Sequence, residues 1–450
     1  MGSTRGQFSS RFGFIMAAAG SAVGLGNVWG FPTNTASNGG GAFLLMYLVL
    51  AFCLAYPALM AELVIGRHTK SNMVSALQKV ATSRLISRFG QLTGFCGLIV
   101  ASLILSFYSI VAGWMISHTI EPVATAMGFA ELAGWLTDFG TTRNLLFAGL
   151  FSLLTIWVIS AGVENGIEKW SSRLMPSLLI ILMLLIVYVL FQDGAIDGLK
   201  HYLVPDFARI TDPQLMISAL GQAFFSLSLG VGTMLIYGSY ISKQENLPKL
   251  GAIVTGVDIS IAFFAGLLIL PAMFVAQHNG VQIYSEAGAL ISEDTLIFQT
   301  LPALFKTMGS AGLFVAFAFF TLMSIAALTS SISMLEVPVS YAVEAHSMKR
   351  RTATWIIGLI ILAISTLIIL NFESLFLFVV HLTTRYSQPL LGIAICLFAG
   401  WVMHRHKILE EIRQGLPNAE QTLFWKVWPA YVRYFCPTLI AITFIQSLRA

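Results

Sequence analysis

The stretch GSAVGLGNVWGFP, residues 20–32, places Asn27 and four glycines in the middle of the first apolar run of the sequence. Glycine is a weak helix former and permits backbone angles that other residues avoid. An unwound stretch surrounded by lipid leaves N–H and C=O groups unpaired unless they line a cavity and bind something. Free carbonyl oxygens are hard ligands suited to Na⁺, whereas amides at the N-terminus of a half-helix attract a carboxylate. The stretch therefore indicates a binding site.

Close helix packing is the alternative explanation, because the glycines form two pairs with the small-xxx-small spacing of packed membrane helices. Packing explains neither Asn27 nor a second interrupted stretch, GQAFFSLSLGVG at 221–232. Two apolar segments broken at matching places favour a site near the middle of the membrane.

Other apolar segments carry groups that could bind a cation. Asp258 lies in TGVDISIAFF, and a carboxylate inside the membrane indicates function by default. The stretch IAALTSSISML contains Thr329, Ser330 and Ser331, so two hydroxyls can share one face with the Ala326 carbonyl. Alternatively, these hydroxyls bond back to carbonyls of their own helix.

Two further features each have a functional and a structural interpretation. Glu62 lies in the second apolar segment, close enough to its end to be a plain interfacial carboxylate. Phe107 and Tyr108 in SFYSIVAGW could contact a ligand, although aromatic residues in membrane helices commonly serve packing.

Membrane helices must position these residues. Of the 450 residues, 57% are hydrophobic and only 10% are charged, and the mean hydropathy is +0.81. A soluble protein needs more charge to cover its surface. The composition therefore predicts a polytopic helical membrane protein. The net charge of +4 gives no reason to expect a nucleic-acid partner, and no nucleophile elbow or HExxH motif indicates an enzyme.

The apolar runs predict eleven membrane segments, each long enough to cross the bilayer. They lie near 10–36, 41–67, 89–118, 143–160, 168–191, 213–240, 248–276, 310–343, 353–370, 374–403 and 424–447. With this division, 19 of the 25 Lys and Arg residues fall on the side of the N-terminus. The asymmetry predicts a cytoplasmic N-terminus and a C-terminus outside.

The two broken segments are the first and the sixth, which suggests an internal repeat. Because the sixth segment comes five segments after the first, an odd number, the second copy would enter the membrane upside down. We expect one transporter domain, 1–450, with a first inverted repeat at 10–191, a second at 213–403 and an extra helix at 424–447.

Together these stretches resemble the neurotransmitter:sodium symporter family, in its bacterial amino-acid-transporting branch with the LeuT fold. The most specific matches are GSAVGLGNVWGFP with NGGGAF after it, GQAFFSLSLGVG and LTSSIS. The resemblance implies an all-α polytopic fold with a 5+5 inverted repeat, discontinuous helices 1 and 6 and an eleventh transmembrane helix. It also implies a multi-pass protein of the bacterial inner membrane that is a monomer or a loose dimer.

Two sodium sites follow from the resemblance. The first would use the Ala22 carbonyl, the side chains of Asn27, Ser226 and Asp258, and the substrate carboxylate. The second would combine three carbonyls and two hydroxyls, those of Gly20, Val23, Ala326, Thr329 and Ser330.

The resemblance also implies a substrate site. The substrate carboxylate would meet the amides of Leu25 and Gly26 and the Tyr108 hydroxyl. The ammonium would meet the carbonyls of Ala22, Phe225 and Ser226 and the Ser228 hydroxyl. The side-chain pocket would be formed by Ser21, Ile104, Tyr108, Phe225, Val231, Ser330 and Met334.

The expected gates come from the same resemblance. Tyr108 and Phe225 would form a thin outer lid, and Arg5 with Glu344, near Tyr240, would form the inner gate. Glu62 would brace the break in the sixth segment.

The usual outer pair of an Arg and an Asp is missing, because Gly30 and the pair Val379 and Val380 occupy those places. We therefore expect Arg385, in VVHLTTRYSQP, to act in outer gating. Alternatively, Arg385 braces its segment against another helix or contacts a polar group of the substrate.

The expected function is import of a neutral, hydrophobic α-amino acid by sodium-coupled symport and alternating access. Gly24 supplies no charge where monoamine transporters carry Asp, so the substrate should bring its own carboxylate. No chloride requirement is expected, because Asp258 already places a negative charge beside the first sodium site. The alternatives are a sodium-coupled transporter of taurine or a β-amino acid, and a non-transporting amino-acid sensor or leak channel.

Overall fold

The computed structural model describes residues 6–283, 290, 297–298 and 301–448, and these residues form mostly helices. The helices of the first part of the chain are α1 (Arg11–Ala22), η1 (Gly26–Gly30), α2 (Phe31–Ser37), α3 (Gly41–Leu50), η2 (Ala51–Ala55), α4 (Tyr56–Thr69), α5 (Met73–Val80), α6 (Arg84–Ala126), α7 (Ala130–Thr137), α8 (Thr141–Ser160), η3 (Val163–Glu168) and α9 (Lys169–Leu190).

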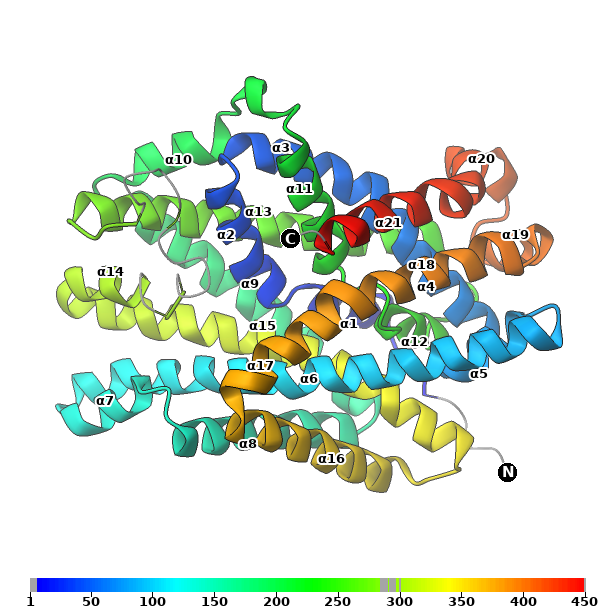
Figure 1. Ribbon diagram of the computed structural model, residues 1–450, viewed down its shortest axis with the longest axis horizontal. Coiled ribbons are helices and arrows are strands. Elements are labelled where there is room, and N and C mark those ends of the chain that lie inside the picture. The colour runs from blue at the N-terminus through cyan, green and yellow to red at the C-terminus, as the bar shows by residue number, and fades with distance from the viewer. Residues whose placement is uncertain (1–5, 284–289, 291–296, 299–300, 449–450) are drawn as a thin grey trace.

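The second part follows the same plan of long helices joined by short ones (Figure 1). Its helices are α10 (Ala195–Leu203), η4 (Phe207–Arg209), α11 (Pro213–Ser226), α12 (Thr233–Ser239), α13 (Leu247–His278), α14 (Leu301–Thr307), α15 (Gly309–Ala345), α16 (Arg350–Leu370), α17 (Phe372–Val380), η6 (His381–Ser387), α18 (Gln388–Leu397), η7 (Phe398–Val402), α19 (Arg405–Arg413), η8 (Ala419–Gln421), α20 (Leu423–Ala430), η9 (Tyr431–Phe435) and α21 (Cys436–Ser447).

Within the described ranges, seven continuous helices are long and apolar enough to cross a membrane. Two bent pairs raise the number to nine: α1 with η1 and α2, bent by 56°, and Phe372–Val402 with α19, bent by 95°. The two other predicted segments correspond to α11 with α12, which are separated by six residues, and to the helical stretch 423–447, which contains Lys426 and Arg433. A helix or a group of consecutive helices is therefore present in each of the eleven predicted membrane segments.

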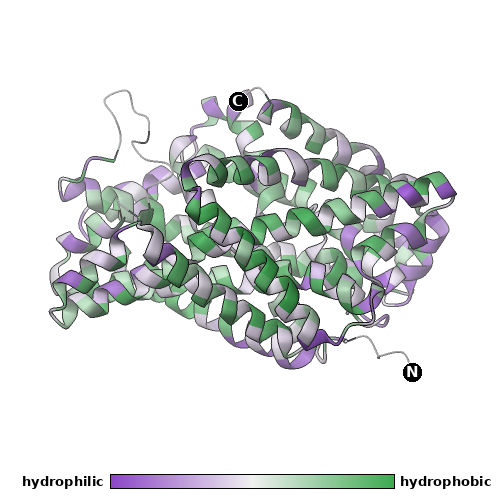
Figure 2. Cartoon of the chain, turned by 60° about the horizontal axis from the view of Figure 1, so that its bottom comes forward, coloured by the Kyte–Doolittle hydropathy of each residue, from purple (hydrophilic) through white to green (hydrophobic). Residues whose placement is uncertain are grey.

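Apolar side chains cover much of the outside of the bundle. Only 33% of the apolar window of the span Val163–Leu190 is buried within the protein, so most of it faces outward. Figure 2 shows hydrophobic residues along the helices and hydrophilic residues gathered toward the ends of the bundle. An apolar belt between polar ends is what a bilayer requires of a protein that spans it.

Both predicted helix breaks are present. Helix α1 ends at Ala22, and Val23 takes an extended conformation with φ −74° and ψ 103°. Helix α11 ends at Ser226, and the next six residues include Gly230 at φ +89° and Gly232 at φ +81°. Glycine is needed at position 230 because a Cβ there would lie 2.5 Å from the Gln388 carbonyl oxygen. Helices α9, α13 and α15 pack against α1, so the first break lies deep within the bundle.

Candidate functional site

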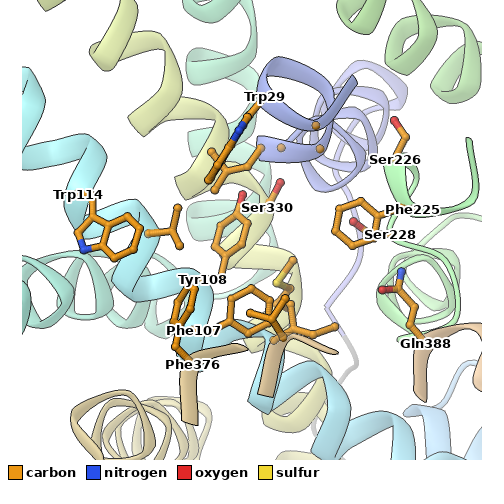
Figure 3. Close-up of a pocket in the computed structure, with 18 of the residues that line it drawn as sticks. Trp29, Phe107, Tyr108, Trp114, Phe225, Ser226, Ser228, Ser330, Phe376 and Gln388 are labelled. Atoms are coloured by element: carbon orange, nitrogen blue, oxygen red, sulfur yellow. The ribbon is translucent and has the colours of Figure 1, made fainter. Parts of the chain in front are cut away.

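A cavity of about 590 Å³ lies against the two helix breaks. In Figure 3, Tyr108 and Ser330 occupy one side of the cavity, and Phe225, Ser228 and Gln388 occupy the other. Among the described residues, no charged side chain lines it; the lining residues are Ala22, Gly24, Leu25, Gly26, Trp29, Gly30, Ile104, Phe107, Tyr108, Val111, Trp114, Phe139, Phe225, Ser226, Ser228, Val231, Phe298, Ser330, Met334, Phe372, Phe376, Leu377, Val380 and Gln388.

The residues predicted for the first sodium site converge beside this cavity. The Asn27 amide donates to Asp258 Oδ1 at 2.7 Å and to Ser226 Oγ at 2.9 Å. The Ser226 hydroxyl in turn donates to Asp258 Oδ2 at 2.9 Å. Asp258 is buried, and no Lys, Arg or His within the described part of the chain forms an ion pair with it. A buried carboxylate with neighbouring amide and hydroxyl oxygens therefore suits a hard monovalent cation.

The residues predicted for the second sodium site also meet, between α1 and α15. Ser330 Oγ lies 3.1 Å from the Val23 carbonyl oxygen and 3.3 Å from that of Gly20. Thr329 Oγ1 lies 3.0 Å from the Ala326 carbonyl oxygen of its own helix. The two hydroxyls therefore behave differently: Thr329 bonds back to its helix, whereas Ser330 reaches across to the unwound end of α1. Five oxygens from two helices are gathered in one place.

Tyr108 and the first break face each other across a narrow gap. The Tyr108 hydroxyl is buried and faces Ser330 and the Leu25 backbone, yet it forms no well-formed hydrogen bond to any described residue. A Cβ at Gly24 would lie 2.6 Å from Ser330 Oγ and 3.1 Å from the Tyr108 hydroxyl. A buried hydroxyl without a partner costs free energy, so this donor is well placed for a polar ligand group.

Of the residues predicted to bind the substrate, all but Ser21 line the cavity. The Ser21 hydroxyl is fully buried and donates to Ser333 Oγ at 2.7 Å, between α1 and α15. Its carbonyl accepts from the Ser228 hydroxyl at 3.2 Å. Ser21 therefore holds the two breaks together and is not a pocket residue, because its side chain points toward α15.

Comparison with known proteins shows the family of this chain. The profile of the sodium:neurotransmitter symporter family matches residues 5–137 and 127–450. The chain belongs to this family. The symporter is 33% identical to an uncharacterized sodium-dependent transporter of Bacillus subtilis, over 98% of this chain and 97% of that protein. It is 31% identical to an uncharacterized sodium-dependent transporter of Haemophilus influenzae, over 99% of this chain and 98% of that protein.

A solved structure shares the whole fold. The crystal structure of MhsT in complex with L-phenylalanine superposes with a TM-score of 0.83 and 34% identity, over 99% of this chain and 100% of that one. MhsT is a LeuT-fold transporter, so the predicted fold class is confirmed. The symporter is a multi-span, sodium-dependent membrane protein, and its family consists of transporters, which are not enzymes.

The predicted inner gate is only partly described in the symporter. Arg5 lies outside the described residues. Glu344 accepts hydrogen bonds from the Asn72 backbone N–H at 2.7 Å and from the Asn72 amide at 3.0 Å. The Tyr240 hydroxyl donates to Glu336 Oε1 at 2.5 Å, and Glu336 also forms an ion pair with Arg350.

Sequence reasoning did not single out Glu336 or Arg350. Glu336 lies inside the predicted membrane segment 310–343. An ionisable residue within the membrane usually has a partner, so its position could have indicated a pair. Glu336 is fully buried and binds Tyr240, directly after the end of α12, and Arg350 at the start of α16.

Arg385 lies outside the cavity, and its role in outer gating stays a prediction. Its side chain is exposed and is not among the lining residues of the cavity. Its backbone carbonyl accepts from the Ser447 hydroxyl of α21 at 3.2 Å. Arg385 belongs to the π-helical stretch η6, which adjoins α21 through this contact.

A group of aromatic side chains forms part of the cavity, and the sequence analysis did not identify most of them. Phe298 contacts the rings of Trp29 and Trp114 at centroid distances of 5.8 and 5.5 Å. Phe376 contacts Trp114 at 5.9 Å and Phe107 at 6.2 Å. These rings come from distant parts of the chain, so no spacing in the sequence links them.

Glu62 supports the second break, as the resemblance implies. Its Oε1 accepts from the Gly230 backbone N–H at 2.8 Å, and its Oε2 accepts from the Leu235 N–H at 3.1 Å. Gly232, at the N-terminus of α12, offers no side-chain cap, so the Glu62 carboxylate satisfies the free amides in its place. With 1% of its surface exposed, Glu62 is not an interfacial carboxylate.

We expect Glu62→Gln to destabilise the broken sixth segment. The amide has one acceptor oxygen, so its NH₂ group faces a backbone donor and one buried N–H loses its partner. The expected cost is about 1–3 kcal/mol of the free energy of unfolding, with slower uptake, measured by thermal melting and transport. Glu131→Gln on the exposed surface of α7 is the control; equal melting temperatures for both variants would refute the bracing role.

Proposed function

We propose that this symporter imports a neutral, apolar α-amino acid together with sodium by alternating access. The absence of charged side chains among the described lining residues carries the proposal. A charged substrate side chain would enter this apolar cavity without a partner, at a high cost. The substrate's own carboxylate would instead meet the Leu25 and Gly26 amides and the Tyr108 hydroxyl.

Coupling would arise from a shared site. In the proposal, Na⁺ binds Asn27, Ser226 and Asp258, and the substrate carboxylate completes the coordination. A second Na⁺ binds the oxygens gathered around Thr329 and Ser330. Because substrate and ion contact each other at the first site, each raises the affinity of the other by the same factor.

The relatives give unequal support to the candidate substrates. MhsT, at 34% identity, is solved in complex with L-phenylalanine. A taurine transporter of Bos taurus is 26% identical over 76% of this chain and 61% of that protein. The ten or so carbons of an aromatic amino acid need a wide apolar cavity, which this structure has, whereas taurine offers little apolar surface to fill it.

Uptake into proteoliposomes tests the proposal. A sodium gradient should drive concentrative uptake of a labelled apolar amino acid, and replacing Na⁺ with K⁺ should abolish it. A competition panel of the common amino acids and taurine should rank apolar side chains first. Preference for taurine would support the alternative substrate class, and binding without accumulation would indicate a sensor or a leak channel.

The arrangement in the membrane is part of the proposal. In the proposal, the N-terminus lies in the cytoplasm and the C-terminus outside the plasma membrane, an orientation that the charge asymmetry of the sequence supports. We propose one transporter domain with the two inverted repeats given above, acting as a monomer or a loose dimer.

Val231 should set the upper limit of substrate size. It lines the cavity and is 1% exposed, so a larger side chain must take its volume from the cavity. We expect Val231→Phe to shift preference toward smaller amino acids by about 1–3 kcal/mol, the usual range for a pocket misfit. The ratio of inhibition constants for alanine and phenylalanine measures the shift, and an unchanged ratio would place the substrate side chain elsewhere.

Transport should not need chloride. Asp258 lies 2.9 Å from Ser226 Oγ, and the Tyr47 hydroxyl lies 3.4 Å from the same atom. A fixed carboxylate at this position makes a chloride ion redundant and repels it at short range. Replacing chloride with gluconate should leave the initial uptake rate unaltered, and a clear loss of uptake would reject the proposal.

A further inference from the structure

A second cavity, of about 290 Å³, lies at the end of the bundle that contains α5 and α19, far from α7 and α14 (Figure 1). It is formed by η7, the start of α19, and the end of α20 with η9. We call it the basic cleft, because Arg405, His404 and Arg433 line it and no acidic residue among the described ones does.

Arg433 is held in the cleft by stacking and not by an ion pair. Its guanidinium carbon lies 3.8 Å from the centre of the Trp401 ring and 5.4 Å from that of Tyr434. Its Nε is buried without a hydrogen-bond partner. No carboxylate pairs with Arg433 or Arg405 within the described part of the chain. Two cations in one cleft without a counter-charge favour an anionic ligand.

The backbone at the start of α19 also favours an anionic ligand. Helix α19 begins at Arg405, and its N-cap His404 makes no side-chain capping hydrogen bond. The N-terminus of a helix attracts anions through its free amides and its dipole. A Cβ at Gly400 would lie 2.7 Å from the Arg433 Cα, so glycine allows η7 and η9 to approach and form the cleft.

The surroundings indicate where the anion comes from. Trp401 and Tyr434 are 53% and 52% exposed, and their rings contact each other at the rim of the cleft. Phe435 and Val427 are exposed on the same helical stretch. Aromatic residues of this kind lie at the headgroup level of membrane proteins, and a basic pocket between membrane helices binds anionic headgroups. Exposed apolar side chains beside the cleft can contact the acyl chains of a lipid whose headgroup lies in the cleft.

We propose that the basic cleft binds the phosphate headgroup of an anionic phospholipid. Arg433 is the principal charge, Arg405 and the start of α19 assist it, and Trp401 fixes the Arg433 guanidinium. The cleft is separate from the substrate cavity, since the two share no lining residue.

Native mass spectrometry of the purified protein tests this proposal, with dioleoyl phosphatidylglycerol and dioleoyl phosphatidylcholine as probes. We expect Arg433→Gln to weaken phosphatidylglycerol binding about tenfold, the effect of losing one charge-assisted contact, and to leave phosphatidylcholine binding unchanged. Lys407→Gln is the matched control, because it removes one exposed charge from α19 outside the cleft. Equal weakening by both variants would mean diffuse surface attraction and would overturn the proposal, as would unchanged binding to Arg433→Gln.

A second variant keeps the test decisive if Arg433→Gln does not fold. Arg405 is exposed, so Arg405→Gln should fold normally and should weaken phosphatidylglycerol binding about threefold. Unchanged binding to this variant would count against the proposal. Soluble glycerol phosphate forms the last arm: if it raises the melting temperature as much as phosphatidylglycerol does, the cleft binds free phosphate and the lipid assignment is wrong.

Discussion

The double variant Thr329→Ala with Ser330→Ala is expected to need at least about tenfold more Na⁺ for half-maximal substrate binding. The change removes two hydroxyls from the group of oxygens between α1 and α15, where Ser330 lies 3.1 Å from the Val23 carbonyl oxygen. A hydrogen-bonding contact to a charged group contributes about 1.5–3 kcal/mol. Substrate binding titrated with Na⁺ by scintillation proximity measures the effect.

Ser331→Ala is the matched control for this variant. Ser331 is the next residue on α15, but its hydroxyl donates to the Leu328 carbonyl and contacts Thr155 of α8, both at 2.8 Å. The control should therefore keep the Na⁺ requirement of the parent. An unchanged Na⁺ requirement in the double variant would remove the second sodium site from the proposal.

Asp258→Asn should nearly abolish sodium-driven uptake. The substitution keeps the size of the side chain and removes its negative charge, which lies 2.7 Å from Asn27 and 2.9 Å from Ser226. Two unit charges about 4 Å apart attract by about 4 kcal/mol at an effective dielectric constant of about 20. Part of this energy offsets the desolvation of Na⁺, so we expect at least about a 100-fold loss of apparent Na⁺ affinity.

Ser260→Ala, on the exposed side of the same helix, is the control for Asp258→Asn, because its hydroxyl bonds back to the Gly256 carbonyl of its own helix. Both variants should be compared with the parent in Na⁺-dependent uptake at matched protein amounts. If Asp258→Asn retained the Na⁺ affinity of the parent, the first sodium site would have to lie elsewhere.

The two predictions rest on features that the sequence contains. Glycines and Asn27 inside an apolar run are costly unless they form a site, and the same holds for Asp258. Such costs depend on residue type and depth in the membrane alone, so the sequence indicated the membrane class, the two breaks and the groups beside them. The structure then placed Asn27, Ser226 and Asp258 within hydrogen-bond distance of one another.

Other features depended on how helices turn toward each other. Arg385 is exposed and does not line the cavity, and a periodic pattern does not reveal that a π-helical stretch such as η6 falls at this point. Ser21 faces Ser333 for a related reason: the register of α1 against α15 selects which side of the break meets the cavity.

By itself, the amino-acid sequence determined that this chain is a membrane transporter with broken helices, because unpaired backbone and buried charge in lipid have few explanations. Only the tertiary structure decided which side chains from different helices line the same cavity. The aromatic part of the substrate cavity joins Trp29, Trp114 and Phe298, and the basic cleft joins Trp401 with Arg433. Such groups form where separate helices cross, and crossing geometry follows from the packing of all their faces together, which no single segment encodes.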